Sequence, residues 1–313
     1  MKKLIFSIVA LCACAGVAAQ SSFYVYKTDG STVEYAVSEV DSISFTKPEG
    51  SSDVLAGAFS VAEGKQIAFS RGNLQYTAST TTWAFAENQY DMIGTANVTG
   101  GTESYDATYG YSKSGSALAD KIDLFGWSGS TGTAKWGIST STDYSNYSGD
   151  FVDWGQNIGG GKTYRTLTYD EWYYLLNTRT DADSKKGVAR IKLSDTEYAN
   201  GLIFLPDSWT CPAGITFKSG FASTWSIEAY ATYQTFTLAE WQKLEAAGAV
   251  FLPASGDRRG SSMDDVQING YYWSATASDS YYAYFLYFSS NYAGTRSSRR
   301  YFGFAVRLVQ DLD

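Results

Sequence analysis

Two segments of the chain combine a helix start signal with apolar residues at helical spacing. Thr168 and Thr237 each stand three residues before a glutamate, and a tryptophan follows each glutamate directly. Thr-x-x-Glu is the pattern of a capping box, in which both side chains accept hydrogen bonds from free amides of the first turn. We therefore predict two short helices, the second ending at Gly248. The residues that we expect these helices to bury are Trp172, Leu175, Leu176, Leu238, Trp241 and Leu244.

Most other apolar residues occur in short runs rich in aromatic and β-branched side chains, which are typical of strands. Long polar segments separate them, and the stretch 99–161 is especially rich in glycine and serine. Two helices among many short antiparallel strands and long loops predict an α+β domain. The predicted strands lie at 23–26, 33–36, 43–45, 66–69, 83–85, 202–206, 249–253, 271–276, 282–288 and 303–309.

The last two of these strands can be assigned faces, because successive side chains of a strand point to opposite sides. We take the side of each strand that carries aliphatic residues as the core. A turn is expected at 291–294, after which the last strand should close the sheet. The residues assigned to the core are Tyr284, Leu286, Phe288, Phe304, Val306 and Leu308.

The remaining side chains of this C-terminal segment form a candidate ligand-binding surface. Its mixture of Tyr, Ser, Asn and Arg resembles an antibody paratope, where rigid rings give contact area and small polar residues adapt the hydrogen bonds. The alternative is a tyrosine-rich sheet edge without a ligand. The candidate binding residues are Tyr281, Tyr282, Phe285, Tyr287, Ser289, Asn291, Tyr292, Arg296, Arg299 and Tyr301.

The N-terminus indicates export. A basic start, an apolar run and small residues before Gln20 are typical of a signal peptide, predicted at 1–19. The alternative is a lipoprotein whose membrane contact is a lipid anchor at Cys14. Both place the protein at the cell surface, in the periplasm or outside the cell. A small β accessory segment at 20–47, a linker at 48–56 and one ligand-binding domain at 57–313 are expected to follow.

Composition excludes several kinds of chemistry. The 313 residues include no histidine, so a Ser-His-Asp triad and a histidine-ligated zinc are impossible. Cleavage before Gln20 leaves Cys211 as the one cysteine, which removes any internal disulfide, and we expect Cys211 to be a buried apolar residue. The net charge of −8 argues against nucleic acid as a partner. We expect no cofactor and no metal site.

Residues 278–301 contain no Lys, Glu, Gln, Met or Trp, the five residues that codons ending in a pyrimidine cannot encode. Such a gap would arise if many of these codons descended from asparagine codons with altered first and second bases. The order of the motifs along the chain resembles exported Bacteroidetes proteins related to the Fibrobacter succinogenes major paralogous domain. The resemblance rests on 72–76, 83–91, 123–127, the two Thr-x-x-Glu-Trp segments, 270–274 and 303–309.

The resemblance implies a C-type-lectin fold, similar to that of formylglycine-generating enzymes and of the variable proteins of diversity-generating retroelements. In the variable proteins, the segment before the closing strand is rewritten at adenines and forms the ligand-binding face. This chain departs from two of these relatives. It lacks the cysteine pair of a formylglycine-generating enzyme, and it lacks the Glu-Pro-Asn, Gln-Pro-Asp and Trp-Asn-Asp calcium motifs of sugar-binding lectins.

We therefore expect a non-catalytic exported protein that binds a protein or glycan ligand through its C-terminal face. One alternative is a carbohydrate-active enzyme, since glycoside hydrolysis needs only two carboxylates. Another is a structural adhesin or surface component that uses the same face for assembly. The candidate carboxylates, which we interpret as helix N-terminal charges, solvent-facing helix residues or an undistinguished loop pair, are Asp170, Glu171, Glu240, Glu245, Asp264 and Asp265.

Overall fold

The computed structural model divides the chain into two units, Met1–Gly50 and Ser51–Asp313. The signal peptide, Cys14, the strand expected at 43–45 and the first part of the linker lie outside the described residues. No helix among the described residues is long and apolar enough to cross a membrane. The described residues are 22–26, 32–36, 53–94, 121–158 and 163–312.

The first unit contains an antiparallel pair of strands, β1 (Ser22–Tyr26) and β2 (Thr32–Ala36). These strands match the two predicted at 23–26 and 33–36. The Tyr24 hydroxyl donates a hydrogen bond to Glu34 across the pair, with an oxygen–oxygen distance of 3.0 Å. An isolated pair of strands is at best marginally stable in water.

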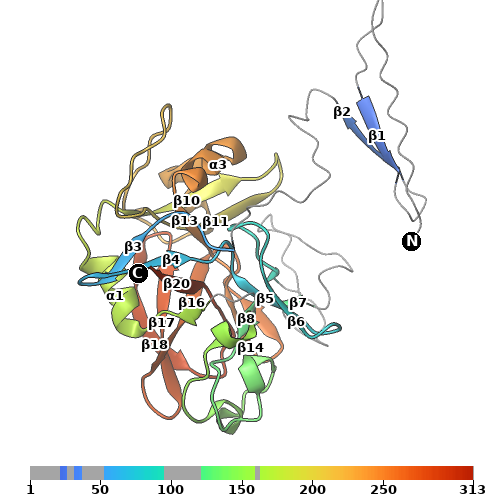
Figure 1. Cartoon of the computed structure of the whole chain (residues 1–313), viewed down its shortest axis with the longest axis vertical. Coiled ribbons are helices and arrows are strands. Elements are labelled where there is room, and N and C mark those ends of the chain that lie inside the picture. Colours follow the sequence, from blue (N-terminus) through green and yellow to red (C-terminus); the bar gives the residue numbers. More distant parts are fainter. Residues whose placement is uncertain (1–21, 27–31, 37–52, 95–120, 159–162, 313) are drawn as a thin grey trace, which may run out of the picture. The chain divides into compact units, whose positions relative to one another are not determined.

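The second unit is an α+β domain that contains several small sheets and three α-helices in its described part (Figure 1). One four-stranded sheet has the order β12 (Thr235–Thr237), β10 (Lys186–Lys192), β11 (Tyr198–Phe204), β13 (Val250–Pro253). A five-stranded sheet has the order β18 (Tyr292–Arg299), β17 (Tyr282–Ser289), β16 (Asn269–Ala277), β19 (Phe304–Ala305), β8 (Leu124–Phe125).

Smaller sheets complete the domain. A second four-stranded sheet has the order β3 (Phe59–Ala62), β4 (Lys65–Phe69), β20 (Leu308–Leu312), β9 (Arg165–Thr166). The others are the three-stranded sheet β6 (Thr82–Phe85), β5 (Leu74–Thr77), β7 (Lys121–Ile122) and the pair β14 (Asp257–Arg259), β15 (Ser262–Asp264). The long polar segment of the sequence contributes the short 3-10 helices η4 (Lys135–Gly137), η5 (Tyr144–Tyr147) and η6 (Trp154–Asn157).

Both predicted helices form where their capping boxes indicate. Helix α1 (Tyr169–Asn177) follows Thr168, and α3 (Leu238–Ala246) follows Thr237; both reciprocal hydrogen bonds of the capping box are present in each. Gly248, with a positive φ of 95°, ends the turn after α3. The expected apolar residues are fully buried except Leu238, which is only partly buried.

A third helix, α2 (Ile227–Tyr233), was not predicted. Its N-cap is Ser226, whose hydroxyl accepts a hydrogen bond from the Ala229 amide at 3.0 Å. An alanine occupies the place where α1 and α3 carry glutamate, so this start has no capping-box signature. The described residues therefore contain three α-helices, one more than predicted.

The prediction for the chain after β17 was wrong in two respects. The turn lies at Ser290 and Asn291, and 292–299, from which only a turn was expected, form the strand β18. The expected closing strand is split: β19 pairs in parallel with β16, whereas β20 pairs with β4 and β9 in another sheet. Every residue from Phe304 to Val309 is buried, so the chain crosses between two sheets without ever presenting a solvent face.

Strand β17 is covered on both faces, which corrects the assignment of its outward side chains. Leu286 and Phe288 pack in a core that includes Trp172 of α1. Phe285 packs in a second core, where its ring centroid lies 4.7 Å from that of Phe304. Phe285 is only 5% exposed, because the segment that carries Phe304 covers the side that alternation had assigned to solvent.

Cys211 is exposed, contrary to the expectation that it is buried. Its thiol lies 3.3 Å from the carbonyl oxygen of Ile215, within a loop that forms no strand or helix. The neighbouring Trp209 and Ile215 are partly buried against the core beneath this loop, whereas the cysteine points away from it.

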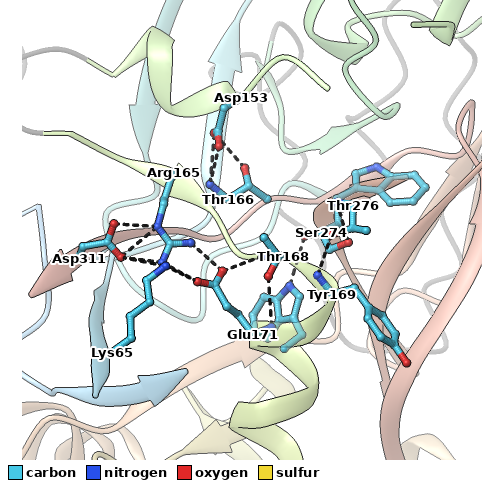
Figure 2. A network of polar contacts seen from close by, with 12 residues as sticks. Lys65, Asp153, Arg165, Thr166, Thr168, Tyr169, Glu171, Ser274, Thr276 and Asp311 are labelled. Carbon is cyan, nitrogen blue, oxygen red and sulfur yellow. Dashed lines mark hydrogen bonds and ion pairs between the residues drawn. The ribbon is translucent and has the colours of Figure 1, made fainter. Parts of the chain in front are cut away.

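Four charged side chains from distant segments meet beside the first turn of α1 (Figure 2). Glu171 accepts hydrogen bonds from Lys65 at 2.8 Å and from both terminal nitrogens of Arg165 at 2.7 and 2.9 Å. Arg165 also donates to Asp311 of β20 at 2.6 Å. The network joins β4, β9, α1 and β20, and so fastens the beginning of the domain to its end.

The network makes the folding stability depend on pH. Burial alone would raise the pKa of Glu171, but hydrogen bonds from Arg165 and Lys65 and from the Thr168 amide bring it below its ordinary value of 4.5. A hydrogen bond from Arg165 likewise lowers the pKa of Asp311. A lowered folded-state pKa contributes stability above the unfolded-state value, and this stability is lost as the pH falls through the folded-state value.

We predict that Glu171→Gln lowers the free energy of unfolding at neutral pH by about 1–3 kcal/mol, because the charged hydrogen bonds are lost while the amide oxygen still caps α1. The variant should also lose less stability than the parent between about pH 5 and pH 3. Glu240→Gln is the matched control, since Glu240 caps α3 without an ion pair to any described residue. Urea unfolding across this pH range measures both effects. Equal losses in the two variants would contradict the role of the network.

Candidate ligand-binding site

The ten candidate binding residues do not form one surface. Phe285, Ser289 and Tyr301 are buried, so the prediction that they face solvent was wrong. The others separate along the hairpin of β17 and β18, whose register pairs Tyr282 with Arg299 at the open end and Ser289 with Tyr292 beside the turn. The exposed or partly exposed candidates are Tyr281, Tyr282, Tyr287, Asn291, Tyr292, Arg296 and Arg299.

At the turn end, two rings and a guanidinium stack. The ring centroids of Tyr287 and Tyr292 lie 6.1 Å apart. The guanidinium carbon of Arg296 lies 4.2 Å from the centroid of Tyr287 and 5.2 Å from that of Tyr292, within the range of a cation–π interaction. Two tyrosines and an arginine from one hairpin thus form a single compact group.

The register of the hairpin explains this stacking. Tyr287 pairs across the strands with Gly294, which presents no side chain. Tyr292 lies two residues before Gly294 on the same face of β18, and its ring occupies the empty space over the glycine. A Cβ atom at position 294 would overlap the Tyr292 hydroxyl and ring. Gly294 is therefore required for the observed position of Tyr292.

Trp225, from the loop before α2, extends this group. Its side chain is 55% exposed, and its indole N–H donates to Oδ1 of Asn269 at 3.1 Å. The Tyr287 hydroxyl donates to the same oxygen at 3.3 Å. We call Trp225, Tyr287, Tyr292 and Arg296 the ring cluster. One amide oxygen of a residue that is only 4% exposed orients two of its four members.

The side chain of Asn269 is itself positioned by a hydrogen bond to Asp265. Its Nδ2 donates to Oδ2 of Asp265 at 2.8 Å, and the Tyr271 hydroxyl donates to the same carboxylate oxygen. Asp265 has a positive φ of 60°, which is uncommon for a residue with a side chain. The strained loop before β16 thus places the carboxylate that orients Asn269, and Asn269 orients the ring cluster.

A pocket of about 460 Å³ lies between the loop 218–224 and α2. Two backbone amides of the loop that carries Trp225, those of Ala222 and Ser226, donate to the Ser290 carbonyl at 2.8 Å and hydroxyl at 3.1 Å. The Ser290 hydroxyl donates to the Thr224 carbonyl at 3.0 Å. The pocket wall is therefore hydrogen-bonded to the hairpin turn that precedes Tyr292.

The ring cluster carries positive charge at neutral pH. The pKa of the Tyr287 hydroxyl is raised, because burial outweighs the opposing effects of Ser289 and Arg296. The phenol therefore stays protonated. Among the described residues, no carboxylate forms an ion pair with Arg296. The arginine is exposed and held by the two rings, which leaves its hydrogen-bonding edge open to a ligand.

The open end of the hairpin holds a separate group. Tyr144 of η5 lies edge-on to Tyr281 and to Tyr301, with centroid distances of 5.3 and 5.2 Å. Arg299 donates to the Tyr301 hydroxyl at 2.9 Å. Here the candidate residues contact one another and a 3-10 helix, and Tyr281 is 55% exposed.

Five of the six carboxylates of the enzyme hypothesis have hydrogen-bond partners, whereas Asp170 is exposed in the first turn of α1. Asp264 accepts from the Asp265 amide at 3.0 Å. Glu171 is buried in the ion-pair network and closes the capping box of α1, as expected of a charge at a helix N-terminus. Glu240 closes its capping box, Glu245 accepts from Gln89 at 2.9 Å, and Asp265 accepts from Asn269. No group of three Cys, Asp or Glu residues suited to a metal occurs within the ranges that the structure describes.

One carboxylate that the sequence did not single out is strongly perturbed. Burial raises the pKa of Asp257 to about 6, against the opposing effect of Arg259, which donates to it at 2.8 Å. The side chain is fully buried in the pair of β14 and β15. Asp264 lies opposite Asp257 in the register of this pair, and the charges of Asp264 and Asp265 add to the rise in its pKa.

Residues 231–309 match a domain of unknown function, DUF8237. The matched range runs from within α2 into β20 and includes three members of the ring cluster, whereas Trp225 precedes it. No curated protein and no solved structure is significantly similar to the chain.

The sequence did not single out four residues that the structure places in the ring cluster, beneath it, in the pocket or at the open end of the hairpin. They are Trp225, Asn269, Lys218 and Tyr144. Trp225 stands in a polar loop with no periodicity, and its contact with Asn269 joins residues 44 positions apart. Asn269 begins a strand that reads as aromatic and apolar, so a buried polar hub could not be distinguished there. An isolated tryptophan in a Ser/Thr loop is the one local signal that could have suggested an exposed ring.

We predict that Gly294→Ala moves the Tyr292 ring away from Tyr287, because the added methyl group overlaps it. Nuclear Overhauser effects between the two rings, clear in the parent, should disappear. Ser297→Ala, at an exposed position of the same strand, is the control and should preserve them. Persistence of the ring contacts in the Gly294 variant would contradict the role assigned to this glycine.

Proposed function

We propose that the second unit is a non-catalytic binding domain of an exported protein and that it recognises a protein or glycan ligand through the ring cluster. The observation that carries the proposal is an exposed group of two tyrosines, a tryptophan and an arginine, preorganised by Asn269. Tyr, Trp and Arg are the residues that dominate binding energies at interfaces. Preorganisation matters because side chains that are already ordered lose little entropy on binding.

We further propose that the domain has a C-type-lectin fold. Two features support this proposal. The antiparallel pairing of β4 with β20 joins the start and the end of the domain, and α1 packs against β17 and β18. In this fold the segment before the closing strand, here β17 and β18, forms the ligand-binding face of variable proteins.

The absence of Lys, Glu, Gln, Met and Trp from residues 278–301 suggests how specificity varies. Tyr287, Tyr292 and Arg296 lie inside this window, whereas Trp225 and Asn269 lie outside it. We propose that the two outside residues are fixed anchors and that the window supplies the variable contacts. A nearby near-copy of these codons, differing at adenines and accompanied by a reverse transcriptase gene, is the expected genomic signature.

Export by a signal peptide at 1–19, with a lipid anchor at Cys14 as the alternative, completes the proposal, and nucleic acid is not a proposed partner. The absence of catalysis is proposed because five of the six candidate carboxylates take part in helix caps, ion pairs or hydrogen bonds, including the bond from Asn269 to Asp265. A surface adhesin would use the same cluster for assembly, and such a protein should self-associate at high concentration.

The test uses arrays of immobilised glycans and of purified surface proteins. Labelled protein should bind a subset of the spots. Trp225→Ala combined with Tyr292→Ala should weaken that binding by at least about thirtyfold, a loss of about 2 kcal/mol typical of hot-spot residues. The melting temperature should change little, because both side chains are largely exposed.

Tyr173→Ala is the matched control, since this tyrosine of α1 is 48% exposed and lies outside the ring cluster. It should bind as the parent does. If the double variant retains the binding of the parent, the ring cluster is not the recognition site. Turnover of any glycan on the array would contradict the non-catalytic proposal.

A further inference from the structure

We infer that the pocket beside Trp225 is part of the same binding site and that it receives the carboxylate of an acidic sugar. The ligand would then be an oligosaccharide that contains uronic acid residues. The inference rests on the proposed binding function and extends it by naming the class of ligand. Three observations support it: the continuity of the surface, the placement of two cations, and the polar walls of the pocket.

The pocket and the ring cluster share one structural support. Ser290 precedes Asn291 in the hairpin turn, and its backbone and side chain hydrogen-bond Ala222, Thr224 and Ser226. Ala222 and Thr224 line the pocket, and Trp225 follows directly. The loop that carries Trp225 therefore connects the pocket with the hairpin turn. An extended ligand that stacks on Trp225 would contact both the pocket and the stacked tyrosines.

Lys218 supplies the charge inside the pocket. Its ammonium nitrogen lies 3.9 Å from the centroid of Tyr233, another lining residue. Its backbone is fixed as well, because the Gln234 side chain accepts from the Lys218 N–H at 3.0 Å and donates to its carbonyl at 2.9 Å. The lysine is thus anchored at both its main chain and its charged end.

Neither Lys218 nor Arg296 has a carboxylate partner among the described residues, in contrast to Lys192, which pairs with Asp195 at 2.8 Å. The chain as a whole carries a net charge of −8, so cations without acidic partners are not the result of a basic composition. One such cation in the pocket and one in the ring cluster match a ligand that carries repeated negative charges.

The shape and chemistry of the pocket favour a saccharide over a protein. Its volume of about 460 Å³ falls within the range of about 300–1,000 Å³ for clefts that hold small ligands. Four side chains with hydroxyls line it, and hydroxyls can both donate to and accept from sugar hydroxyls. They are Ser223, Thr224, Thr232 and Tyr233, the last of which donates to the Ser219 carbonyl. A stable protein interface would need about 800 Å² on each side, far more than a few exposed rings provide.

The experiment measures binding of the full chain to a short oligogalacturonate and to its methyl ester by isothermal titration calorimetry. The ester has the same sugar rings without the charges, so the acid should bind at least about tenfold more tightly, as expected for hydrogen bonds between charged groups. Lys218→Gln should remove most of this preference while leaving the affinity for the ester unchanged. Lys243→Gln, on exposed α3, is the matched control and should behave as the parent does.

Each other outcome overturns the inference in a distinct way. Equal affinity for acid and ester, with loss of both in the Trp225/Tyr292 double variant, would refute the carboxylate site but leave the ring cluster as a glycan-binding surface. A preference that survives in Lys218→Gln would place the charge recognition elsewhere. If the parent binds neither sugar, the inference is wrong, and array binding to a protein target that depends on Trp225 would still uphold the proposed function.

Discussion

Burial of both faces of β17 is the constraint that decides where this domain can meet a ligand. Phe285 points into one core and Leu286 and Phe288 into another, so these positions of β17 are closed to solvent. Only the two ends of the hairpin present rings. At the turn end, Gly294 leaves room for Tyr292 to stack beside Tyr287, and a compact exposed cluster results.

This surface depends on segments that are distant in the sequence. Trp225 comes from the loop before α2, Asn269 from the start of β16, and Asp265 from the strained loop that precedes it. Elsewhere in the domain, the network of Glu171, Arg165, Lys65 and Asp311 joins α1 to the sheet of β4, β20 and β9 (Figure 2). A ligand therefore meets side chains whose positions are fixed before it arrives, which favours affinity.

Features that depend on interactions between residues near one another in the chain could be predicted from the sequence. The Thr-x-x-Glu-Trp segments became α1 and α3, because a capping box acts within one turn. Alternation misplaced Phe285, because a strand covered on both sides no longer has a solvent face. The strand β18 was missed because its small and polar residues resemble a loop, and Trp225 was missed because its contacts are set by tertiary structure. Of the candidate site, Tyr287, Tyr292 and Arg296 could be named in advance, but not the residues that orient them.

The most direct test of the central claim is hydroxyl-radical footprinting of the full chain, with and without a target identified on the arrays. Trp225 and Tyr292 are 55% and 44% exposed, so both should be oxidised in the free protein and protected in the complex. Tyr173, which is 48% exposed on α1, should be oxidised equally in both. Protection at Tyr173, or at the Tyr281 end of the hairpin, with none at Trp225 and Tyr292 would contradict the account.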